Sequence, residues 1–134
     1  MLVIKNSYLA SIIFPAAPSN GQKLFFKDIP TLRDKIINGF EAYSASDLAV
    51  TPDGNTVIAD ADIDQITITL VDKNQNEFIF NAPIINFNPR NQGGFIREIC
   101  PNKVDFTRSY ITVTDNTGIS QNEAVAFTFY YNAR

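Results

Sequence analysis

Residues 123–131, EAVAFTFYY, decide the fold class of this chain. Large apolar side chains alternate here with small or polar ones. In an extended chain, one face would carry Val125, Phe127, Phe129 and Tyr131, and the other Ala124, Ala126 and Thr128. Because successive side chains of a β-strand point to opposite faces, this pattern predicts a strand that buries one face in a core.

The same alternation recurs along most of the chain. QITITLVDKNQNEFIFNAP, residues 65–83, predicts a hairpin with KNQN as its turn and with Thr67 and Thr69 on the polar face. RSYITVTD, residues 108–115, predicts a strand that leads through the turn NTGISQN to residues 123–131. Further strands are expected over residues 22–28, 35–43 and 94–99.

Helices are nearly excluded. Only residues 31–35 and 44–48 could be helical, and neither has the length or apolar spacing of a typical helix. Strands recur about every ten residues with turn residues between them, which is typical of an antiparallel sandwich or jelly roll. The sequence predicts an all-β fold, an antiparallel β-sandwich and more specifically a single jelly roll, with an N-terminal arm at residues 1–20 and one domain at 21–134.

Composition narrows the function classes. The 134 residues suffice for one domain, and the net charge of -3 comes without any basic run, which argues against direct nucleic-acid binding. The chain has no histidine, so the commonest general base and metal ligand is missing. Its single cysteine, Cys100, has no histidine to activate it and is expected to act as a small buried hydrophobe. We therefore expect no enzyme, no cofactor and no small-molecule substrate.

The N-terminus is apolar but does not read as a signal peptide, because its apolar run is short and its start is not basic. No stretch approaches the roughly 20 apolar residues that cross a bilayer, so no transmembrane segment is expected.

Several strands carry adjacent apolar residues, which must face opposite sides of the sheet. The outward members are covered either by loops or by neighbouring subunits. The residues expected at such an interface are Ile4, Tyr8, Ile12, Phe14, Phe25 and Tyr130.

Asp60, Asp62 and Asp64 are the one conspicuous polar constellation. An EF-hand loop starting at Asp60 would need glycine at its sixth position and glutamate at its twelfth, where the chain has Gln65 and Val71. On an extended strand the three carboxylates would share one face, about 7 Å apart. We interpret them as a solvated strand entrance that discourages edge pairing, with a calcium site as the alternative.

A second motif, NPRNQGG at residues 88–94, could cradle an anion with Arg90 and Gly93-Gly94, although a turn is the simpler interpretation.

The chain resembles the small single jelly-roll proteins of virus particles, in particular penton or minor capsid proteins of tailless phages. The resemblance lies in the apolar segment MLVIKNSYLASIIF, the paired strands QITITLVDKNQNEFIFNAP, and NKVDFTRSYITVTDNTG before the closing strand EAVAFTFYY. It implies a non-enzymatic protein located in the virion, made in the host cytoplasm. Its implied partners are copies of itself, as a homo-oligomer such as a pentamer, and neighbouring capsid proteins.

The competing hypothesis is a monomeric, lectin-like β-sandwich that binds carbohydrate. Surface tyrosines such as Tyr43 and Tyr110 would then provide the stacking surfaces for sugar rings. The N-terminal segment separates the two hypotheses, because an assembly protein would need it for oligomerisation and a binding module would not.

Overall fold

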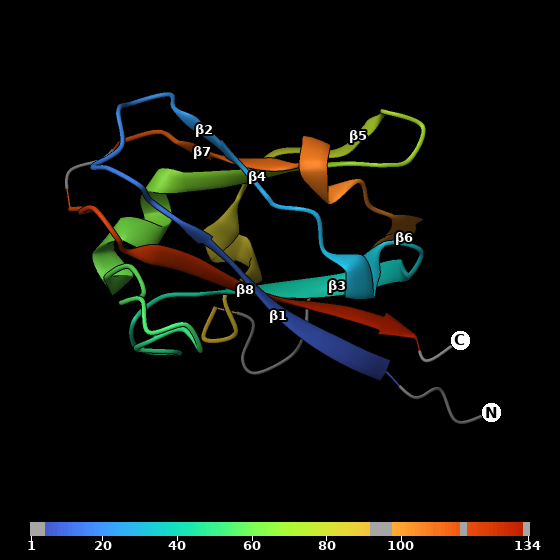
Figure 1. The fold of residues 1–134 in the computed structure, drawn as a ribbon, viewed down its shortest axis with the longest axis horizontal. Helices are drawn as coiled ribbons and strands as arrows, with labels where there is room; N and C mark the ends of the chain where they lie inside the picture. Colours follow the sequence, from blue (N-terminus) through green and yellow to red (C-terminus); the bar gives the residue numbers. More distant parts are fainter. Residues whose placement is uncertain (1–4, 92–97, 116–117, 133–134) are drawn as a thin grey trace.

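The chain folds into two four-stranded antiparallel sheets packed face to face, which confirms the expected all-β sandwich (Figure 1). This computed structural model describes residues 5–91, 98–115 and 118–132. The strands are β1 (Lys5–Ile13), β2 (Lys23–Phe25), β3 (Ile36–Tyr43), β4 (Ile66–Val71), β5 (Glu77–Pro83), β6 (Glu98–Lys103), β7 (Tyr110–Val113) and β8 (Ala124–Asn132). Short 3-10 helices lie between them: η1 (Pro30–Leu32), η2 (Asp60–Gln65), η3 (Ile84–Phe87) and η4 (Phe106–Arg108).

The strand order follows a simple rule. One sheet, sheet A, has the order β1-β8-β3-β6, and the other, sheet B, has the order β2-β7-β4-β5. The first strand therefore pairs with the last, the second with the seventh, the third with the sixth and the fourth with the fifth. Two further pairings, β3 with β8 and β4 with β7, complete the sheets. The chain is thus one long two-stranded ribbon that has been rolled into two layers.

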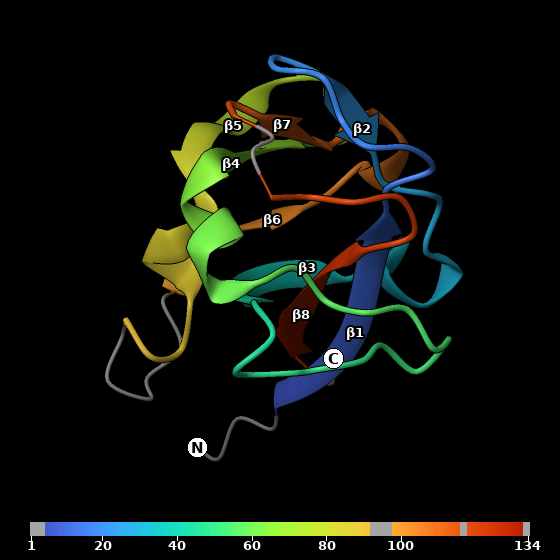
Figure 2. The ribbon, with the colours of Figure 1, turned by 90° about the vertical axis from the view of Figure 1, so that its left-hand side faces the viewer.

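β8 fills the centre of the core, as its sequence predicts. Phe127 and Phe129 are completely buried, and the ring of Phe26 lies 5.5 Å and 5.8 Å from their rings. The opposite face is also covered at the start of the strand, where Ala124 and Ala126 are fully buried. Here residues 56–58 run beside β8, and Figure 2 shows the loop that follows β3 crossing in front of this end of the sheet.

The N-terminal segment expected as an arm is largely part of the sandwich. Its residues 5–13 are β1, which pairs with β8 over the whole strand. Ile12 and Phe14, expected at a subunit interface, lie instead in the core of their own chain. The reason is the alternation of the strand, which turns its even-numbered side chains towards sheet B. Ile4, also expected at an interface, lies outside the described residues, as does most of the strand expected at 94–99.

Candidate functional site

The three aspartates at residues 60–64 do not form a strand entrance. Residues 60–65 form η2, and the Asp62 N–H donates to the carbonyl of Ala59 at 2.9 Å. With about three residues per turn, alternate side chains of a 3-10 helix point in different directions. Asp60 and Asp64 are exposed, whereas Asp62 is 6% exposed and faces Gly118. The expectation of a shared face is therefore wrong, and no described group of three acidic or cysteine side chains is placed to hold a metal ion.

Asp60 is the acceptor of several hydrogen bonds. Its carboxylate accepts from both the backbone N–H (3.0 Å) and the hydroxyl of Ser46, and from the Ser44 hydroxyl at 2.7 Å. These donors, those of Ser46 first, lower the pKa of Asp60 to about 2 because they stabilise the ionised form. The pKa of Asp62 moves the other way, raised by burial and then by the charge of Glu123. Two carboxylates that look equivalent in the sequence thus have opposite environments.

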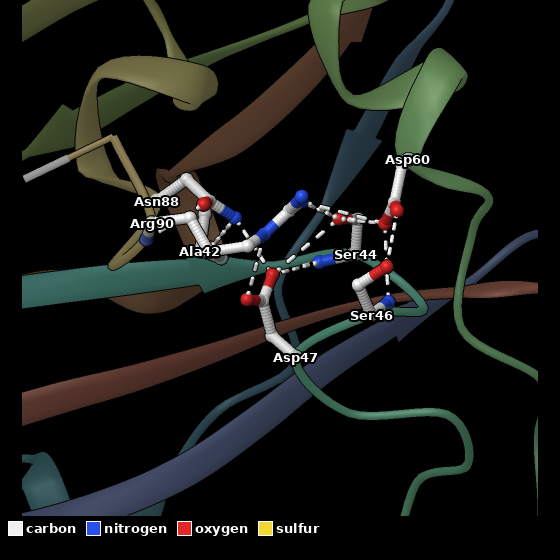
Figure 3. A network of polar contacts seen from close by, with 7 residues as sticks. All are labelled: Ala42, Ser44, Ser46, Asp47, Asp60, Asn88 and Arg90. Carbon is white, nitrogen blue, oxygen red and sulfur yellow. Dashed lines mark hydrogen bonds and ion pairs between the residues drawn. The ribbon is translucent and has the colours of Figure 1, made fainter. Parts of the chain in front are cut away.

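Arg90 joins this cluster from another part of the chain. Its Nε donates to Asp47 at 3.0 Å, and its terminal nitrogen donates to the Ser44 hydroxyl at 2.9 Å and lies 3.4 Å from Asp60 (Figure 3). The guanidinium therefore faces carboxylates of its own chain, which disfavours the anion-cradle interpretation. Gly93 and Gly94, the other half of that motif, lie outside the described residues.

Asn88 ties the cluster to sheet A. It is 2% exposed, and its amide group donates to the carbonyl of Ala42 at 3.2 Å and to Asp47 at 2.8 Å. Its side-chain oxygen accepts the backbone N–H of Arg90 at 3.0 Å. We call the set Ser44, Ser46, Asp47, Asp60, Asn88 and Arg90 the Arg90 network. Because its members satisfy one another, the network is a brace that holds three loops at the end of β3.

The outer face of sheet A carries a second polar cluster. The Tyr130 hydroxyl donates to Glu41 at 2.6 Å, and the Tyr43 hydroxyl lies 3.0 Å from the same oxygen and 2.7 Å from the hydroxyl of Thr128. Burial, followed by the hydrogen bond to Glu41, raises the pKa of Tyr130. Tyr130, expected at an interface, and Tyr43, expected to contact sugar, are thus half-buried and engaged within the chain.

The outer face of sheet B is more open. Phe25, also expected at an interface, is 53% exposed, and its ring lies 5.2 Å from that of Tyr110. The ammonium group of Lys23 lies 4.7 Å from the centre of the Tyr110 ring. Tyr110, expected at the surface to contact sugar, is instead buried, at 8% exposed. The Phe25 and Tyr110 side chains border a groove of about 520 Å³, whose polar lining includes Glu77 and Arg108. We call it the Phe25 groove; its aromatic wall and polar rim are suited to a neutral, hydroxyl-rich or mixed-polarity ligand.

A third open region runs beside β1. Two adjoining pockets, of about 730 and 200 Å³, are lined on one side by β1 and on the other by residues 22–29, with Asp53 lining both. Tyr8, expected at an interface, lines the smaller pocket and is half-buried. We call this region the β1 groove. On this side no described strand pairs with β1.

The sequence alone identified neither the Arg90 network nor the polar cluster of Glu41, Tyr43, Thr128 and Tyr130, because both join residues that are distant along the chain. Among the described residues, no helix has the length and apolar character to cross a membrane. Comparison with family models, with curated proteins and with solved structures gives no match. Function is therefore inferred from the chain's own geometry.

Proposed function

We propose that the protein is a structural component of a virus particle, a vertex or minor capsid protein that works by association and not by catalysis. The observation that carries this proposal is the pairing of the strands, first with last through to fourth with fifth. We infer that this rolled ribbon of eight strands is a jelly roll, an architecture used by viral capsid domains and also by lectins. The resemblance noted in the sequence and the strand order thus favour the same class.

Exposed apolar side chains support association. Large hydrophobic side chains reach the surface from three of the four edge strands as well as from β3 and a loop: Leu9, Ile13, Phe25, Ile36, Val50 and Phe80. Single exposed hydrophobic residues are normal on a monomer. Here they gather on the edges of both sheets, where another chain can pack against them or pair with the strand. Subunit contacts would cover them in an assembled particle.

The proposal is tested by the native mass of the purified protein, measured by sedimentation from micromolar to millimolar concentration and followed by electron microscopy. We expect a discrete closed oligomer, whose mass gives its symmetry. Point variants are better suited to this test than deletion of residues 1–14, because that deletion would remove β1 and the buried Phe14 from the core. A chain that stays monomeric throughout this range contradicts the proposal.

The Phe25 groove favours a second candidate, a carbohydrate-binding module. An exposed aromatic ring beside carboxylate, guanidinium and amide groups offers both stacking and hydrogen bonds to a sugar. A glycan array with the wild-type protein and a Phe25→Ala variant tests this function. Binding that disappears in Phe25→Ala, in a chain that is monomeric, would assign the protein to this class.

A further inference from the structure

The four sheet edges of this molecule differ in how they are protected. Edge strands expose unpaired backbone groups, and natural proteins block them with short length, charge, proline or bulges. β2 has only three residues, and β5 pairs with β4 through register shifts, with Asn81 at a positive φ of 52°. β6 contains Pro101 and begins and ends with the charged residues Glu98 and Lys103. Three of the edges therefore carry a recognisable protection.

β1, the fourth edge, has none of these protections. It is nine residues long and keeps a continuous register with β8, with no bulge. It contains no proline, and after Lys5 it has no charged residue. Two of its own apolar side chains, Leu9 and Ile13, are 37% and 39% exposed. No described strand pairs with β1 on the side away from β8, where the β1 groove lies, and Figure 1 shows β1 in front of β8 with no other strand drawn across it.

The hydrogen bonds at the end of β1 show which backbone groups face the open side. Ala124, the partner of Ile13, uses its N–H and carbonyl for residues 56 and 58, not for β1. The next residue, Phe14, donates instead to the carbonyl of Glu123 at 2.8 Å. In an antiparallel pair these two arrangements alternate along the strand. The N–H and carbonyl groups of Ser7, Leu9, Ser11 and Ile13 therefore point away from β8, towards the open side.

We propose that β1 pairs with β1 of a second copy, antiparallel across a two-fold axis at Leu9, so that the two copies of sheet A become one continuous sheet. Leu9 is the midpoint of Lys5–Ile13, so this register overlaps the full strand. It places Ser7 opposite Ser11 of the second copy and keeps the two Lys5 residues at opposite ends. The contact is isologous, because the same strand serves both sides. The inference rests on the proposed function only in that both require copies of the chain to associate.

Disulfide trapping tests this pairing. Directly opposite residues in a hydrogen-bonded antiparallel pair have Cα atoms about 5.5 Å apart, within the range that a disulfide spans. Cys100, which the sequence predicted to be buried, is exposed. In a Cys100→Ser background, which removes this natural thiol, Leu9→Cys should form disulfide-linked dimers at least tenfold faster than Phe80→Cys. Phe80 is the matched control because it is 65% exposed and lies on another edge strand, β5. Equal rates for the two variants would overturn the proposal.

A proline variant tests it without a new bond. Leu9→Pro removes an N–H that β8 does not use, and proline is tolerated on edge strands in that position. We expect native circular dichroism with a tenfold or greater rise in the dimer dissociation constant. If Leu9→Pro associates like the wild type, β1 pairing is wrong while assembly through another surface stands. A wild-type chain that stays monomeric overturns both the β1 pairing and the proposed assembly. If that monomer binds an unrelated extended peptide along β1, the partner of this edge is another protein and not a second copy.

Discussion

Replacement of Asn88 by alanine should destabilise the protein strongly, although Asn88 is a loop residue. The change removes the donor to the carbonyl of Ala42, the donor to Asp47 and the acceptor of the Arg90 N–H. Asp47 keeps its ion pair with Arg90, whereas the Ala42 carbonyl, in a fully buried residue, and the N–H of the exposed Arg90 lose their partner. At about 1–3 kcal/mol for the unsatisfied buried carbonyl and about 1 kcal/mol for the hydrogen bond to the Arg90 N–H, the expected loss is about 3 kcal/mol of unfolding free energy.

Urea denaturation, monitored by far-ultraviolet circular dichroism, measures this loss of unfolding free energy. For a domain of this size about 3 kcal/mol corresponds to a fall in Tm of about 12 °C. Asn91→Ala is the matched control, because Asn91 is exposed and its side-chain amide donates to the carbonyl of Ile85. Asn88→Asp should cost at least as much at neutral pH, since an acceptor then faces Asp47, and its deficit should shrink in acid. If Asn88→Ala lies within about 1 kcal/mol of Asn91→Ala, the network is not a brace.

Three further predictions concern single groups. The folded pKa of Asp60 is about 2, below its ordinary value of 3.8, so its stabilising contribution is present above pH 4 and lost as the pH falls to 2. The difference in Tm between wild type and Asp60→Asn should therefore close over that interval, and a constant difference would contradict it. Phe127→Ala should cost about 3–5 kcal/mol in urea denaturation, while Phe80→Ala on the surface stays within about 1 kcal/mol. Ser109→Ala should lower the free energy of unfolding by about 1–3 kcal/mol, because the buried Ser109 hydroxyl accepts the Val71 N–H and donates to the Asp105 carbonyl. A fall in Tm no larger than that of Ser7→Ala would refute this role.

The strands could be predicted from the sequence because alternation is a local property of neighbouring residues. Residues 123–131 form the core strand for that reason. The same local argument was incomplete for β4, where Thr67 and Thr69 were assigned to a polar face. Both are buried, and Asn81 on β5 satisfies their hydroxyl groups. The Asn81 side-chain oxygen accepts from the Thr67 hydroxyl, and the Asn81 backbone N–H donates to the Thr69 hydroxyl. Burial of a polar side chain depends on a partner elsewhere in the chain, which alternation does not show.

The candidate sites were less predictable than the fold. Asp60 was identified as a candidate residue, but the prediction that it lies on an extended strand was wrong. Residues 60–65 form a 3-10 helix instead, and this conformation buries Ile63 while it leaves Asp60 exposed. Its partners Ser44 and Arg90 lie far from it in the sequence, and nothing in the local pattern joins them. Some of the residues expected at an interface are buried in the core and others are exposed, for a similar reason. Ile12 and Phe14 face the core, whereas Phe25 faces outwards, and the sequence did not assign the two sides of each apolar doublet.

The pairing of the first strand with the last also constrains how the protein is made. β8 lies between β1 and β3 and contributes Phe127 and Phe129 to the core. Neither neighbouring strand can complete its ladder until residues 124–132 have left the ribosome. Contacts between such distant segments form slowly, because the long loop between them must first close. A chain truncated before residue 124 would expose the core and two unpaired edges, so only a chain translated beyond residue 132 could present the surfaces proposed for assembly.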